Sequence, residues 1–246
     1  MPSSSHRPRK RFGQHFLHDP QVLARIVEAV APRPGDLIVE IGPGEGAITS
    51  PLLERAGALQ VVEIDRDLAA RLGERPGLTV HEADALEFDF ARFPAGMRLV
   101  GNLPYNISTP FLFHLARYAE RVRDLHFMLQ LEVVERMVAA PSTAAYGRLS
   151  VALQARFTME KLFTVGKGAF RPAPKVESAL VRMVPLVAAL AIDEDLLRRA
   201  FSARRKQLRN ALAGVDLARA GIDPTLRPEN LSPADYARLS AVSASR

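Results

Sequence analysis

Short apolar runs alternate with amphipathic stretches along the first half of the chain. The apolar runs predict strands near 37–41, 59–63, 78–82, 97–101 and 125–130. The stretches between and around them have helical periodicity, which predicts helices near 20–31, 47–57, 66–74, 107–119 and 131–140. Strands that alternate with helices in this way are typical of βαβ units, in which helices cover a parallel sheet. The pattern therefore predicts an α/β fold.

The pattern changes in the second half of the chain. A helical stretch at 146–157 leads into two further predicted strands, 161–166 and 178–185, with a proline-rich loop between them. Beyond residue 186 the pattern is helical, at 193–214 and 232–243, without strands. We therefore predict two domains, an α/β body over 1–187 and a small helical domain over 188–246.

Composition excludes several classes of protein. With 246 residues and 48% hydrophobic side chains, the chain can bury a full core. No apolar run approaches the roughly 18–20 residues of a membrane span, and no hydrophobic stretch follows the basic start as it would in a secretory signal. The absence of cysteine excludes disulfides and thiolate metal sites. We expect a cytoplasmic protein.

Charge is distributed unevenly along the chain. Residues 147–246 hold 17 basic and 9 acidic side chains, whereas residues 1–146 hold 16 basic and 18 acidic ones. Within the first 13 residues there are four basic groups and no acid, so a nearly neutral or acidic body lies between basic ends. This arrangement suits a polyanionic partner such as a nucleic acid, although a solvated basic surface would give the same count.

A glycine-rich turn follows the first predicted strand. Gly42, Gly44 and Gly46 in "VEIGPGEG" stand where a strand would pass into a helix, so the backbone can turn sharply and approach a ligand closely. Glu63 ends the next strand, where an acid grips a ribose diol in dinucleotide-binding folds, and Asp84 follows the third strand. A plain tight turn, with Asp84 as a helix cap, is the alternative. Because the full G-x-G-x-x-G spacing is missing, we predict an adenosine-bearing cofactor other than a nicotinamide.

Seven segments in order carry a resemblance to a known family. The chain strongly resembles the S-adenosylmethionine-dependent ribosomal RNA adenine dimethyltransferases of the KsgA type in "FGQHFL" (12–17), "VEIGPGEG" (39–46), "VVEID" (61–65), "EADAL" (82–86), "GNLPYNISTP" (101–110), "YGRLSV" (146–151) and "AFRPAPKVESALVR" (169–182). The resemblance implies a Rossmann-like class I methyltransferase domain with a mostly parallel seven-stranded sheet, followed by a small all-helical domain that binds RNA. It also implies S-adenosylmethionine as the cofactor.

The most specific of these segments, "GNLPYNISTP", predicts how the exocyclic amine of an adenine is activated. Such an amine is a poor nucleophile, because its lone pair is delocalised into the ring. If the side-chain oxygen of Asn102 and the backbone carbonyl of Leu103 accept its two N–H bonds, the lone pair points outward. Pro104 holds the residue before it extended, and Tyr105 offers a ring for stacking. The resemblance places Phe170 on the other face of the adenine; the alternative is an aromatic that closes the edge of the core.

The resemblance also assigns the remaining site residues. It implies that cofactor contacts come from His15, Leu17, Gly42, Gly44, Glu63, Asp84 and Asn102, with no metal. Two basic segments, "RKRFGQ" and "ARRKQLRNAL", are expected to bind RNA backbone. Helical spacing would place Arg198, Arg205 and Arg209 along one face of the tail helix.

These observations favour an enzyme that dimethylates two adjacent adenosines in a hairpin loop near the 3′ end of 16S ribosomal RNA. Its expected partner is that RNA within a small ribosomal subunit or its precursor, bound by a monomer without DNA or membrane contact. Two alternatives remain open. One is a large-subunit ribosomal RNA adenine methyltransferase, and the other is an assembly or transcription factor with little turnover.

Overall fold

The computed structural model of the protein describes residues 14–244. The basic segment "RKRFGQ" (9–14), predicted to contact RNA, lies outside the described residues except for Gln14. Packing divides the chain into two compact units, one of residues 14–134 with 160–184 and the other of 135–159 with 185–244. The predicted domain boundary at 187/188 remains a prediction, because packing within the chain does not reveal which part binds RNA.

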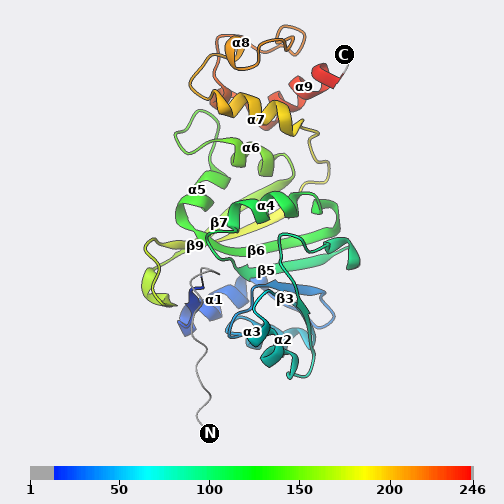
Figure 1. The fold of residues 1–246 in the computed structure, drawn as a ribbon, viewed down its shortest axis with the longest axis vertical. Coiled ribbons are helices and arrows are strands. Elements are labelled where there is room, and N and C mark those ends of the chain that lie inside the picture. Colours follow the sequence, from blue (N-terminus) through cyan, green and yellow to red (C-terminus); the bar gives the residue numbers. More distant parts are fainter. Residues whose placement is uncertain (1–13, 245–246) are drawn as a thin grey trace. The chain divides into compact units, whose positions relative to one another are not determined.

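The first unit is organised by a seven-stranded sheet, as the sequence predicts. Its strands are β2 (Ile38–Ile41), β3 (Leu59–Glu63), β4 (Leu78–Glu82), β5 (Met97–Asn102), β6 (Val122–Gln130), β7 (Phe157–Val165) and β9 (Ser178–Pro185). Their order is β4-β3-β2-β5-β6-β9-β7, and the first five are parallel, whereas β9 runs antiparallel to β6. Several of these strands are labelled in Figure 1. The pair β1 (Phe16–Leu17) and β8 (Phe170–Arg171) forms a separate small sheet that the sequence pattern does not predict.

The helices lie close to their predicted positions, and their ends follow local capping rules. They are α1 (Pro20–Val30), α2 (Thr49–Ala56), α3 (Arg66–Gly73), α4 (Ser108–Ala116), α5 (Leu131–Val138), α6 (Arg148–Gln154), α7 (Glu194–Ser202), α8 (Leu208–Ala211) and α9 (Pro233–Ala244). For example, the Asp19 side chain caps α1 by accepting hydrogen bonds from the amides of Gln21 and Val22. At the other end of α1, Ala31 adopts a left-handed conformation with φ of 46°.

The tail helix predicted at 193–214 is wrong as one element, because the chain turns at residues 203–207. A continuous helix would place Arg204 one turn after Ala200, which is fully buried. In the turn, the Arg204 guanidinium instead reaches Glu229 at 2.6 Å and the carbonyl of Ala144 at 2.9 Å. Arg198, Arg205 and Arg209 therefore do not share a helix face, which corrects that prediction.

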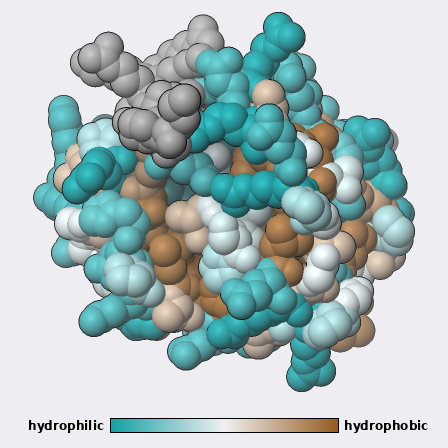
Figure 2. Space-filling view, turned by 90° about the horizontal axis from the view of Figure 1, so that it is seen from below, coloured by the Kyte–Doolittle hydropathy of each residue, from teal (hydrophilic) through white to brown (hydrophobic). Residues whose placement is uncertain are grey.

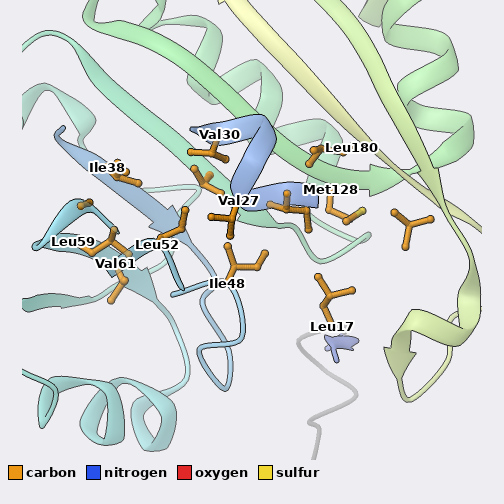
Figure 3. Packing of buried hydrophobic residues seen from close by; sticks show 14 of the residues in the cluster. Leu17, Val27, Val30, Ile38, Ile48, Leu52, Leu59, Val61, Met128 and Leu180 are labelled. Carbon is orange, nitrogen blue, oxygen red and sulfur yellow. The ribbon is translucent and has the colours of Figure 1, made fainter. Parts of the chain in front are cut away.

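Each unit has its own apolar core. In the first unit, aliphatic side chains of α1 and α2 pack against the sheet, and Figure 3 shows Val27, Ile48 and Leu52 pointing into this cluster. In the second unit, leucines of α7 and α8 surround Tyr146 and Tyr236, whose hydroxyls donate to the carbonyls of Leu231 and Pro228. Both phenols are thus buried without an unsatisfied donor.

The face shown in Figure 2 is mostly polar. On the face shown in Figure 2, hydrophobic residues reach the surface in recesses between hydrophilic ones. Within residues 14–244, no helix combines the length and apolar character needed to cross a membrane, and no three His, Cys, Asp or Glu side chains are grouped to hold a metal ion.

Candidate active site

A cavity of about 320 Å³ opens where the parallel strands of the first unit end. Its walls come from the segments that follow β2, β3, β4 and β5, together with the segment before α1. Among the predicted site residues, it is lined by His15, Leu17, Gly42, Gly44, Glu63, Asp84, Asn102, Leu103, Pro104 and Tyr105. The carboxyl ends of parallel strands are where open α/β sheets bind ligands, so the sheet gathers these residues at one place.

The glycine turn after β2 forms the floor of this cavity. Gly42 and Gly44 have φ of 62° and 57°, a region that L side chains rarely adopt. A Cβ on Gly44 would lie 2.9 Å from the Phe16 ring, and one on Gly42 would lie 4.0 Å from Pro104. Glycine therefore allows the turn to pack under the segment before α1. The turn also lies beside the bend that Asn102, Leu103, Pro104 and Tyr105 form at the end of β5, the Asn102–Tyr105 corner.

Glu63 fixes the turn to the neighbouring strand. Its side chain is 4% exposed, and its two oxygens accept hydrogen bonds from the Gly44 amide at 3.1 Å and the Asp65 amide at 2.9 Å. Burial raises the pKa of Glu63, and these two hydrogen bonds act in the opposite direction. The carboxylate is thus held in one orientation at the cavity wall.

Asp84 both shapes its own loop and lines the cavity. Its Oδ1 accepts a hydrogen bond from the Leu86 amide at 2.8 Å, which is the local turn-forming role that the sequence alternative predicts. Its place in the cavity lining is compatible with the predicted cofactor contact as well.

Sequence reasoning missed several lining residues, and two of them, Glu40 and Ile64, bear on ligand binding. Glu40 lies within β2 and is 1% exposed, and burial raises its pKa to about 7. Ile64 is 44% exposed although it is a large aliphatic residue that lines the cavity. The available signals were a carboxylate inside an apolar strand and an apolar residue directly after the acidic end of β3.

Asn102 ends β5 with its amide held in a defined orientation. Its Nδ2 donates to the His15 carbonyl at 2.8 Å. Within residues 14–244, no hydrogen bond is made to its Oδ1, so this oxygen is the acceptor that a ligand can use. The Leu103 amide donates to the Met128 carbonyl at 3.1 Å, which ties the start of the corner to β6.

Tyr105 is held from two sides. Its hydroxyl shares a hydrogen bond of 2.8 Å with Ser178 Oγ. Its ring centroid lies 5.4 Å from that of His15 with 30° between the planes, and the His15 Nδ1 lies 2.7 Å from the Pro172 carbonyl. The phenol ring is therefore fixed at the cavity edge by β9 and by the segment before α1.

Phe170 does not line the cavity, and its place opposite Tyr105 on the other face of an adenine remains a prediction. Its side chain is 3% exposed and packs with Leu17 and Leu180 in the first core. It belongs to β8, where it pairs with Leu17 of β1. This position matches the alternative, an aromatic that closes the edge of the core.

Several carboxylates line the cavity. Among the described residues, Glu40, Glu45, Glu63 and Asp84 line it, and no lysine or arginine does. Such a lining disfavours an anionic pyrophosphate and favours a ligand that carries positive charge.

The strand order, the antiparallel β9 and the cavity at the glycine turn define a class I methyltransferase. The chain belongs to the ribosomal RNA adenine dimethylase family, whose model matches residues 5–244. As a member of this family it is a ribosomal RNA adenine dimethyltransferase that depends on S-adenosylmethionine.

Individual relatives agree with this assignment. The chain is 60% identical to the ribosomal RNA small subunit methyltransferase A of Aromatoleum aromaticum, over 96% of this chain and 94% of that protein. It is 58% identical to the protein of the same name from Chromobacterium violaceum, over 96% of each. A dimethyladenosine transferase structure from Plasmodium falciparum superposes with a TM-score of 0.79 at 25% identity, over 92% of this chain and 96% of that one. The 23S ribosomal RNA methyltransferase ErmE gives 0.69 at 27%, over 92% and 98%.

The residues of the cavity fit S-adenosylmethionine. This cofactor carries a sulfonium and an ammonium group, and the described part of the lining provides four carboxylates and no lysine or arginine. It also has an adenosine moiety, for which the fixed Glu63, Asp84 and the exposed apolar surface of Ile64 are chemically suitable partners.

Proposed function

We propose that this protein transfers methyl groups to the N6 atoms of two adjacent adenosines in a hairpin loop near the 3′ end of 16S ribosomal RNA. The observation that carries the proposal is the Asn102–Tyr105 corner beside the acidic cavity, with the Asn102 oxygen available to a ligand. The names of the two bacterial relatives support the small subunit as the source of the RNA. We further propose that the protein acts as a monomer in the cytoplasm, on a maturing small subunit.

In the proposed mechanism, the corner activates the adenine amine. Asn102 Oδ1 and the Leu103 carbonyl accept the two N–H bonds, so that the nitrogen lone pair faces the acidic cavity. Bound S-adenosylmethionine would supply an electrophilic methyl group there. The new bond from the amine nitrogen to this methyl carbon would replace the carbon–sulfur bond, whose electron pair would stay on sulfur, and a proton would leave the product nitrogen to water. Positioning of the two reactants can supply much of the rate.

The target base must leave its helical stack to reach this corner. In the proposal, Tyr105 stabilises the extruded base by stacking, which is worth about 1–3 kcal/mol per base. The hydrogen bond to Ser178 and the contact with the His15 ring support this role, because they fix the phenol before the base arrives.

Methylation of large-subunit RNA is the competing function. It is favoured by the structural similarity to ErmE, whose corresponding activity is on 23S RNA. The experiment that separates the two uses labelled methyl donor with purified small and large subunits that both lack adenine dimethylation. Label on two adjacent adenosines of 16S RNA supports the proposal, whereas label confined to 23S RNA, or absent from both, contradicts it.

The tail is proposed to bind RNA through the turn at 203–207. Arg205 and Lys206 are exposed there, whereas Arg204 is held by Glu229. For Arg205→Gln with Lys206→Gln, we expect weaker binding to a small-subunit RNA hairpin. The plot of log binding constant against log salt concentration should become less steep, by about 0.7 in slope for each phosphate that the protein no longer neutralises. Titrations at several salt concentrations measure this slope.

The matched control for that experiment preserves charge. Arg205→Lys with Lys206→Arg should bind with the salt dependence of the original protein. If the neutral variant also keeps the original slope, this turn is not part of the RNA interface.

A further inference from the structure

Arg75 connects the glycine turn to the start of α2. It lies in the loop between α3 and β4, and its guanidinium reaches the segment between β2 and α2. Nη1 donates to Ser50 Oγ at 3.0 Å, and Nη2 donates to the Glu45 carbonyl at 3.5 Å. Ser50 Oγ in turn donates to the Gly46 carbonyl at 3.0 Å. One side chain from a distant loop thus holds both ends of the segment 45–50.

Gly46 leaves space for this guanidinium. Its φ is 85°, and a Cβ placed there would lie 2.8 Å from Arg75 Nη1 and 3.2 Å from Cζ. No real Cβ contact is so short, so either the turn or the arginine would have to move. The third glycine of "GPGEG" therefore makes room for the Arg75 guanidinium. It does not line the cavity, whereas Gly42 and Gly44 do.

The same guanidinium acts electrostatically on Glu40, which lines the cavity from β2. Burial raises the pKa of Glu40 to about 7, and the charge of Glu63 adds to that effect. The Thr49 side chain and the positive charge of Arg75 lower it. Glu63 on β3 and Arg75 after α3 are the charged groups that face Glu40 among the described residues. Near neutral pH, Arg75 thus favours the ionised carboxylate that a cationic ligand requires.

We propose that Arg75 is a positioning residue for cofactor binding, which sets the glycine turn through its hydrogen bonds to Ser50 and Glu45. Arg75 itself does not line the main cavity, so it acts through these neighbours. The inference rests on the cofactor assignment of this site and is independent of which RNA is methylated.

The test is titration calorimetry of the full chain with S-adenosylmethionine between pH 5.5 and 8.5. For Arg75→Gln we expect affinity about 10-fold lower, as for loss of a hydrogen bond to a charged group. Affinity should rise with pH as Glu40 loses its proton, and the pH at half of this rise is the midpoint. We expect the midpoint to lie at higher pH in Arg75→Gln, because Glu40 then keeps its proton to higher pH. Arg75→Lys should restore that midpoint, since it returns the charge, while recovering only part of the affinity.

Gly46→Ala provides a second variant, in which the methyl group displaces the guanidinium without removing it and also strains the turn, because φ at this position is 85°. It should move the midpoint in the same direction as Arg75→Gln. Arg71→Gln is the matched control. Arg71 is exposed on α3, one turn before Arg75, and makes no hydrogen bond with the described residues. The Arg71→Gln variant should bind S-adenosylmethionine with the affinity and the midpoint of the original protein.

The outcomes are separable. Lower affinity with an unmoved midpoint in Arg75→Gln would reduce Arg75 to a structural role and overturn the inference, as would affinity within twofold of the original at every pH. If the original protein does not bind S-adenosylmethionine at all, the cofactor site itself is refuted. Normal cofactor binding without methylation of 16S RNA would instead refute only the proposed substrate.

Discussion

Replacement of Asn102 by alanine should reduce methyl transfer by at least about 100-fold, the usual cost of losing one preorganised hydrogen-bond partner at a reacting centre. The Asn102 amide is fixed through its Nδ2 by the His15 carbonyl at 2.8 Å, so its Oδ1 is directed by the protein before substrate binds. Without that oxygen, the adenine lone pair stays conjugated with the ring. Single-turnover assays with labelled donor measure the loss, and calorimetry with the cofactor should show binding largely retained.

An isosteric variant separates the oxygen from its orientation. Asn102→Asp keeps an acceptor but loses the Nδ2 donor, and a carboxylate would meet the His15 carbonyl with like partial charge. We expect activity between those of the alanine variant and the original protein. Turnover at the original rate in Asn102→Ala would refute the amine-orienting role, whatever the aspartate variant does.

The fold could be predicted from sequence where one local pattern decides the structure. The strand at 59–63 coincides with β3, and the helix predicted at 20–31 differs from α1 by one residue, because apolar periodicity and Asp19 capping agree there. The turn at 203–207 could not be predicted in this way. It contains neither Gly nor Pro, and it depends on Arg204 meeting Glu229, which is remote in sequence.

Some residues of the candidate site could likewise be predicted from local pattern and topology, and others could not. Gly42, Gly44, Glu63 and Asn102 stand at strand ends, so topology alone brings them together. The side chain of Phe170 could be assigned only by knowing that β8 pairs with β1 and covers the core. Pairing of two-residue strands leaves no periodic signal, since each contributes a single inward-facing position.

The largest effect on stability is expected at the opposite end of the sheet. Arg98 at the start of β5 is 4% exposed, and its Nη2 donates to Asp124 Oδ2 on β6 at 2.9 Å. Nη1 donates to Asp36 Oδ2 at 2.8 Å, and the same guanidinium also donates to the carbonyls that end α1. Its removal would leave Asp124 buried without its cation. Arg123 pairs with Asp36, and His126, whose Nδ1 lies 3.6 Å from Asp124 Oδ1, is uncharged near neutral pH because burial lowers its pKa to about 4. Breaking a buried pair in this way costs about 3–5 kcal/mol.

Arg98→Met should therefore lower the free energy of unfolding by that amount in urea titrations, with unchanged cofactor affinity in the folded protein. Arg98→Met combined with Asp124→Leu should be less destabilised than Arg98→Met alone, because no buried charge is left unpaired on β6. Equal or greater loss in the double variant would show that packing, and not the unpaired carboxylate, is responsible.

The lowered pKa of Asp36 makes part of the stability loss in Arg98→Met depend on pH. Although burial raises its pKa, hydrogen bonds from Arg98 and the Arg33 amide and the charges of Arg98 and Arg123 together hold the pKa below the ordinary value of 3.8. A depressed pKa stabilises the folded state fully above the unfolded-state value and loses this contribution as pH falls through the folded-state value. The part of the stability difference between the original protein and Arg98→Met that comes from Asp36 should thus be constant near neutrality and be lost below about pH 4. A difference that persists unchanged at lower pH would mean that the Asp36 pair contributes nothing to stability.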